Sequence, residues 1–214
     1  MRNLFLLAIV ALAFSSCSNS GNGKQSFCDT TCKKDSIHFK ANDQFNSIVS
    51  IGLKNCDADT ISWSHDRMDF SKRMSMKELA KQDVRINQNT MSCVFQDTVR
   101  AWLTFNDCFT GRGFLFKLPF GKGEGISQIT GAINAFDPKF SIEPDLRAYT
   151  DRGSIFVINI KTGEEAMMTF KEQYDIDFDK IHDVVDSVNI TSKRIYVELL
   201  KNGQEVPLEK SIKL

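Results

Sequence analysis

Most of the chain after residue 27 alternates between apolar and polar side chains with a period of two, and this pattern constrains the fold more than any other feature. Residues 49–53 and 99–105 are clear examples. Successive side chains of a β-strand point to opposite faces of a sheet, so this alternation predicts strands with one buried face. The sequence therefore predicts a mainly β fold: an antiparallel β-sandwich or a meander-rich sheet domain, with one or two short helices.

Two local patterns place individual strands. Residues 155–160 are apolar on both faces and are bounded by Gly153 and Gly163, which predicts a central strand. The dipeptide Asn202-Gly203 predicts a type I′ hairpin that pairs residues 195–201 with the residues from 204 onward. Pro207 would then lie at a sheet edge or in a bulge.

Helices are expected in only two places. Ser75 and Glu78 form a capping-box pattern for a short helix that extends through Gln82. A second helix is predicted to begin at Asp179, although its apolar spacing fits a following strand equally well. The glycine-rich residues 121–125 fit either a hinge between two halves or a long hairpin loop, and we favour a loop within one domain.

The N-terminus has the order of an export signal. Arg2 precedes an apolar stretch at residues 4–14, and small residues lead from there to Cys17. A transmembrane helix needs about 20 apolar residues, so this stretch is too short to span a bilayer.

Phe14, Ser15, Ser16 and Cys17 resemble the lipobox of bacterial lipoproteins. This resemblance implies cleavage before Cys17, a diacylglycerol on the Cys17 sulfur and fatty acyl chains such as palmitate on the new N-terminus. Residues 1–16 are then a signal peptide, residues 17–26 are the lipidated cysteine with a flexible linker, and residues 27–214 form the mainly β domain. The uncharged residues 19–23 resemble those of lipoproteins sent to the outer membrane, so we expect a tether that faces the periplasm.

The order of turn and strand residues between 140 and 169 resembles one repeat of a TolB-type β-propeller. A propeller needs at least four blades of roughly 40 residues, and the other segments lack the same order. We interpret the resemblance as a sign of a local strand-turn-strand meander.

The remaining cysteines are expected to oxidise in an exported protein. Their number is odd, so the arithmetic predicts two disulfides and one thiol, with the pairing open. Structural disulfides, a thiol-redox role and a metal site that includes His38 are the alternatives. The disulfides are expected among Cys28, Cys32, Cys56, Cys93 and Cys108.

Residues 175–186 are rich in aspartate and give the most metal-like spacing in the sequence. Asp175, Asp177 and Asp179 would be the first ligands of a calcium loop, but Lys180 stands where the sharp turn demands glycine. A strand with three carboxylates facing water is the alternative, and we expect neither a metal nor another cofactor.

The sequence lacks common catalytic motifs, since it has no Gly-x-Ser-x-Gly and no His-Glu-x-x-His. The histidines His38, His65 and His182 are far apart, so a hydrolase would need a dispersed site. The 17 Phe residues favour core packing, and sugar stacking would rest on Trp63 and Trp102 alone.

The 27 basic residues balance the 27 acidic ones, which argues against a nucleic-acid partner. We therefore expect a membrane-anchored periplasmic lipoprotein with a non-catalytic binding or envelope-assembly role. Its partner would be an envelope protein or a small apolar ligand. A hydrolase or a thiol-dependent enzyme is the alternative.

Overall fold

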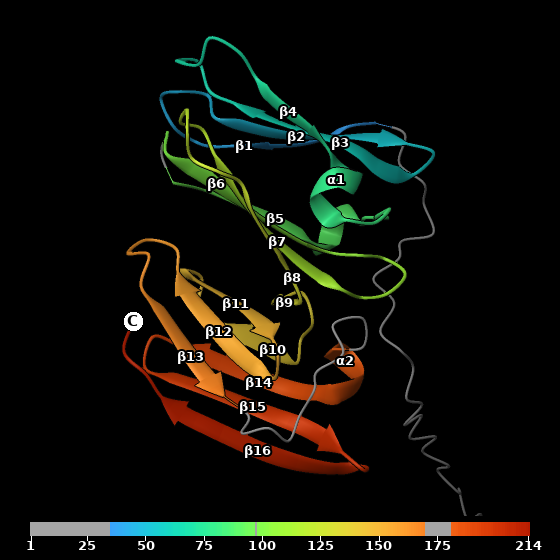
Figure 1. Cartoon of the computed structure of the whole chain (residues 1–214), viewed down its shortest axis with the longest axis vertical. Helices are drawn as coiled ribbons and strands as arrows, with labels where there is room; N and C mark the ends of the chain where they lie inside the picture. The colour runs from blue at the N-terminus through green and yellow to red at the C-terminus, as the bar shows by residue number, and fades with distance from the viewer. Residues whose placement is uncertain (1–34, 97, 170–180) are drawn as a thin grey trace, which may run out of the picture.

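The computed structural model describes residues 35–96, 98–169 and 181–214, and they form four four-stranded sheets stacked into two β-sandwiches (Figure 1). The first sandwich comprises residues 37–130 and the second residues 132–214. Gly131 alone separates the last strand of the first sandwich from the first strand of the second. The predicted mainly β fold is confirmed.

The first sandwich contains two antiparallel meanders in which every strand pairs with its neighbour in sequence. The first meander consists of β1 (Ile37–Lys40), β2 (Ile48–Lys54), β3 (Asp57–Ser64) and β4 (Lys72–Ser75). The second meander consists of β5 (Met91–Gln96), β6 (Arg100–Asn106), β7 (Gly113–Pro119) and β8 (Ser127–Thr130). The short elements α1 (Met76–Ala80) and η1 (Gln88–Thr90) connect the two meanders.

In the second sandwich, β10 lies between β9 and β11 in the sequence but belongs to the opposite sheet. One sheet has the order β13-β12-β11-β9, with β9 (Ala132–Ile133), β11 (Leu146–Asp151), β12 (Ser154–Asn159) and β13 (Glu165–Thr169). The other sheet has the order β10-β14-β15-β16, with β10 (Phe140–Ile142), β14 (Val185–Thr191), β15 (Arg194–Lys201) and β16 (Gln204–Ser211). Helix α2 (Ile181–Val184) leads into β14, and β10 pairs with β14 in the parallel sense.

The alternation of apolar residues explains the core of the first sandwich. Val49 and Ile51 of β2 are fully buried against Phe114, Phe116 and Leu118 of β7 in one cluster. Phe105 stacks on Phe114 with ring centroids 5.0 Å apart, so these two phenylalanines pack in the core as predicted.

The predicted half-buried strand at residues 99–105 is wrong in one respect, because β6 is buried on both faces. Trp102 and Thr104, on the face expected to meet water, are each only 5% exposed. The second sandwich covers this face, where Trp102 and Leu115 pack with Ala132 and Ile160. An alternating strand pattern cannot reveal that a second layer covers its polar face.

The predicted hairpin at Asn202 and Gly203 is confirmed. Asn202 and Gly203 both have positive φ, at 53° and 76°, and connect β15 to β16 as the type I′ hairpin requires. Pro207 lies in β16, at the edge of its sheet. The glycine-rich residues 121–125 form the loop between β7 and β8, and residues 154–159 form the central strand β12.

The predicted helix after Ser75 is shorter than expected and ends at Ala80. Ser75 is still the last residue of β4, and its side chain makes no capping hydrogen bond. Lys81 ends the helix with a left-handed φ of 60°. Within the described residues the second predicted helix is α2, which ends at Val184, because Val185 onward forms the strand that the same spacing also fitted.

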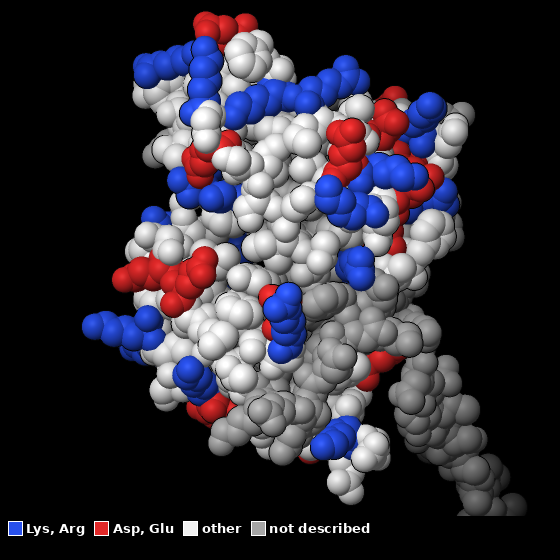
Figure 2. All heavy atoms as spheres, in the orientation of Figure 1, with Lys and Arg blue, Asp and Glu red and all other residues white. Residues whose placement is uncertain are grey.

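In the described part of the chain, no helix has the length and apolar character needed to cross a membrane. Basic and acidic side chains are interspersed on the visible face of both sandwiches (Figure 2).

Candidate ligand-binding site between the sandwiches

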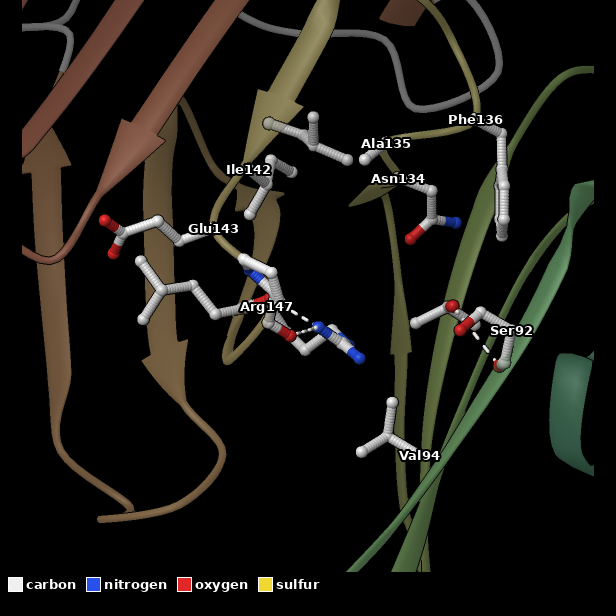
Figure 3. A pocket seen from close by; sticks show the side chains of 12 residues that line it. Ser92, Val94, Asn134, Ala135, Phe136, Ile142, Glu143 and Arg147 are labelled. Atoms are coloured by element: carbon white, nitrogen blue, oxygen red, sulfur yellow. Dashed lines mark hydrogen bonds between the residues drawn. The ribbon is translucent and has the colours of Figure 1, made fainter. Parts of the chain in front are cut away.

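A cavity of about 290 Å³ lies where the outer face of β5 and β6 meets the second sandwich (Figure 3). Ser92, Val94 and Thr104 line it from the first sandwich. The second sandwich lines it with the residues after β9 and with those between β10 and β11. These residues are Ile133, Asn134, Ala135, Phe136, Ile142, Glu143, Pro144, Leu146 and Arg147.

Arg147 is the cation of this cavity, and it has no ion pair among the described residues. It lies on β11 between the buried Leu146 and Ala148, so the strand alternation turns its side chain away from the core and toward β5. Its Nη1 donates to the carbonyl oxygens of Pro144 and Leu146, at 2.8 and 2.6 Å. Its Nε is buried and has no hydrogen-bond partner.

The surroundings of Arg147 disfavour its charge. Burial lowers the pKa of the guanidinium, and the nearby Asp145 opposes this shift. Asp145 is itself engaged, because Lys161 binds its carboxylate at 2.7 Å. A buried cation without a bound anion is costly, so this side chain is suited to receive one.

Asn134 supplies a fixed hydrogen-bond acceptor in the same cavity. Its Nδ2 donates to the carbonyl oxygen of Phe105 at 3.0 Å and to Oδ1 of Asn106 at 2.9 Å. Two acceptors at one end of the amide set its orientation, which leaves Oδ1 at the other end. Figure 3 shows this oxygen on the side where Arg147 lies.

Glu143, the carboxylate that lines the cavity, does not face the guanidinium of Arg147. Glu143 accepts a hydrogen bond from the backbone N–H of Ser192 at 2.7 Å, and its carboxylate points away from Arg147 in Figure 3. The rest of the wall is mostly apolar, with Val94, Phe136 and Ile142 among the residues that line it. The cavity therefore combines one cation, one amide acceptor and an apolar surface.

Cys93 lies beside this site but faces the other way. It packs against the core of the first sandwich, while its neighbours Ser92 and Val94 line the cavity. Burial raises the pKa of Cys93 to about 12, although the charge of Arg147 acts in the opposite direction. The thiol is therefore protonated at neutral pH, whereas a nucleophilic cysteine needs a lowered pKa.

The cysteines in the described residues divide into two groups. Cys93 is a free thiol, whereas Cys56 and Cys108 are disulfide-bonded. Cys17, Cys28 and Cys32 lie outside the described residues.

The two histidines whose side chains are described, His38 and His65, do not gather into a catalytic group. His38 Nδ1 lies 2.8 Å from Ser50 Oγ across β1 and β2, in an exposed position. His65 lies in the loop after β3, where its Nδ1 accepts the N–H of Arg67 and its ring packs on Phe120. Neither histidine lines the cavity beside Arg147. The side chain of His182 is outside the described residues.

The remaining predicted site residues do not add to this site. Asp175, Asp177 and Asp179 lie outside the described residues. The described part of the chain holds no group of three His, Cys, Asp or Glu side chains suited to a metal ion. Trp63 and Trp102 are both buried, at 1% and 5% exposure, so neither offers a face for sugar stacking.

A second cavity of about 290 Å³ opens at the far end of the first sandwich, between the loops after β3 and β7. Lys72 Nζ there donates to the carbonyl oxygens of Pro119 and Gly121, Lys122 pairs with Asp69 at 3.6 Å, and the guanidinium of Arg67 lies over the Phe45 ring, 4.2 Å from its centroid. The cavity between the sandwiches is therefore the stronger candidate for a ligand.

Sequence reasoning missed both Arg147 and Asn134. Arg147 occupies a polar position in an alternating strand, which reads as a solvent-facing residue, and Asn134 follows a strand of only two residues. No local pattern could have revealed that the two face a second sandwich.

Comparisons with protein-family models, with curated proteins and with solved structures find no match to this chain.

Proposed function

We propose that this chain is a lipid-anchored, non-catalytic binding protein of the outer membrane that faces the periplasm and holds a small ligand between its two sandwiches. The anchor in this proposal is Cys17, at the end of the export signal. Several acyl chains on one residue give stable attachment, since each buried methylene contributes about 0.8 kcal/mol.

The observation that carries the binding role is the unpaired guanidinium of Arg147 in the wall of a cavity. Folding around such a group costs free energy unless a partner offsets the loss of water. The described residues supply two carbonyl oxygens and no carboxylate. A ligand that pairs with the guanidinium of Arg147 would offset this cost in free energy.

The cavity favours binding over catalysis. A nucleophile needs an adjacent base or a lowered pKa, but the nearest thiol, Cys93, has a raised one. Ser92 and Thr104 line the cavity, and no histidine is among the described residues that line it with them. The cavity also has the small size and mostly apolar wall that are typical of ligand sites.

The anchor and the binding role are tested separately. For the anchor, cells expressing the chain or Cys17→Ala are separated into inner-membrane, outer-membrane and soluble fractions. We expect the unchanged chain in the outer-membrane fraction, with acyl chains on Cys17 by mass spectrometry. An unacylated chain in the cytosol would overturn the anchor.

For the binding role, the full lipidated chain is purified from solubilised envelope and examined by native mass spectrometry. We expect a bound small molecule that is lost in Ser92→Phe, which fills the cavity, and retained in the matched variant Ser211→Phe on the exposed edge strand β16. The same bound mass in both variants, or no bound mass in the unchanged chain, would contradict a ligand site between the sandwiches.

A further inference from the structure

We propose that the ligand of the cavity between the sandwiches is a small monocarboxylate with an apolar group, and that Arg147 binds its carboxylate. This inference rests on the proposed function and names the chemical class of the ligand.

The free edge of the guanidinium fits a carboxylate. Nη1 of Arg147 is occupied by the carbonyl oxygens of Pro144 and Leu146. The remaining donors, Nε and Nη2, lie along one side of the planar group, and Nε has no partner. Two parallel N–H groups match the two oxygens of a carboxylate in a bidentate pair.

A carboxylate ligand also supplies the negative charge that Arg147 lacks as a partner. Asp145 is bound by Lys161, and Glu143 is turned toward the N–H of Ser192. Neither acid pairs with Arg147. An anionic ligand therefore meets an unpaired cation, whereas a cationic ligand would be repelled.

The size of the cavity limits the rest of the ligand. Its 290 Å³ holds about ten units of the volume that a water molecule occupies, and thus a ligand of about ten non-hydrogen atoms. Val94, Phe136 and Ile142 offer an apolar surface to a short chain or a single ring. Oδ1 of Asn134 is positioned to accept a hydrogen bond from a hydroxyl or amide N–H of the ligand.

Phenylacetate is a suitable probe, because it joins a carboxylate to one apolar ring and has about ten non-hydrogen atoms. Its neutral counterpart, phenylacetamide, has nearly the same shape without the charge. Binding of each is measured by isothermal titration calorimetry to the full lipidated chain in lipid nanodiscs, with empty nanodiscs as the blank. We expect phenylacetate to bind at least about tenfold more tightly than phenylacetamide.

Three variants separate the guanidinium from the rest of the chain. Arg147→Met keeps much of the side-chain volume and removes the charge, and we expect it to weaken phenylacetate binding about 10- to 100-fold. Arg147→Lys keeps the charge without the planar fork and should give an intermediate affinity. Arg152→Met, in the exposed turn between β11 and β12, is the matched control and should bind like the unchanged chain. Circular dichroism establishes that each variant is folded.

Equal affinity for phenylacetate and phenylacetamide would overturn the proposal, as would unchanged phenylacetate affinity in Arg147→Met. Inorganic phosphate that binds more tightly than phenylacetate would overturn the carboxylate class in favour of a phosphate. A neutral or cationic ligand found by native mass spectrometry and lost in Ser92→Phe would sink this inference while leaving the binding role in place.

Discussion

The side-chain amide of Gln96 in the first sandwich donates a hydrogen bond to the backbone carbonyl oxygen of Ile160 in the second. The oxygen of the same amide accepts the indole N–H of Trp102 at 2.8 Å. Both ends of one amide are thus used where the two halves meet, beside the apolar cluster of Trp102 and Ile160.

We expect Gln96→Leu to lower the free energy of unfolding by about 1 to 3 kcal/mol, because it leaves the indole N–H of Trp102 without its acceptor in a buried place. Urea unfolding measures the change. Gln128→Leu, at an exposed position of β8, is the control and should change stability by less than about 0.5 kcal/mol. Equal effects of the two substitutions would mean that the Gln96 contacts contribute nothing specific.

Gly113 sets how closely the two sandwiches approach. A Cβ atom at this position would lie 1.9 Å from the backbone oxygen of Ala132, which cannot move away as a side chain could. We expect Gly113→Ala to destabilise the fold by at least about 1 to 3 kcal/mol, as overpacking does in other cores. Gly121→Ala meets no atom within 4 Å and should be neutral or slightly stabilising. Thermal unfolding of the two variants compares them directly.

The buried thiol of Cys93 gives the fold a pH dependence in the alkaline range. Its folded pKa is raised from 9.0 to about 12, so between these values the unfolded chain loses a proton that the folded chain keeps. The contribution of the thiol to the free energy of unfolding is therefore complete below pH 9. It is lost as the pH rises toward 12, by about 1.4 kcal/mol for each pH unit.

We expect Cys93→Ala to have a flatter stability profile than the unchanged chain above pH 9, as measured by urea unfolding at a series of pH values. The difference between the two profiles isolates Cys93 from the lysines and tyrosines that titrate in the same range. Parallel profiles across that range would show that the thiol ionises with its ordinary pKa.

The bonded state of Cys56 and Cys108 predicts the pattern of thiol labelling. When the full chain is unfolded without reductant and treated with iodoacetamide, we expect Cys93 to be labelled and Cys56 and Cys108 to appear only in disulfide-linked peptides. Mass spectrometry of these peptides also identifies their partners. Alkylated Cys56 or Cys108 in the unreduced sample would contradict the bonded state.

The sequence predicted the turns and core positions that depend on neighbouring residues. It did not predict which strand faces are covered by the other sandwich. The turn at Asn202 and Gly203 follows from local backbone preferences, so it could be placed. The alternation in β2 and β6 identified core residues, because one face of each strand must be buried. The polar faces of β6 and β11 could not be assigned, since only the stacking of the sandwiches decides that Trp102 and Arg147 face another sheet.

The placement of β10 in the sheet of the last strands sets an order in which the two sandwiches can assemble. Each sheet of the first sandwich pairs strands that follow one another, so its strand pairing needs nothing beyond residue 130. Phe140 can pair with Val188 only once β14 is available. The first sandwich can therefore form its sheets while the second is still incomplete, and the part of the cavity wall at Ile142 and Glu143 is completed late.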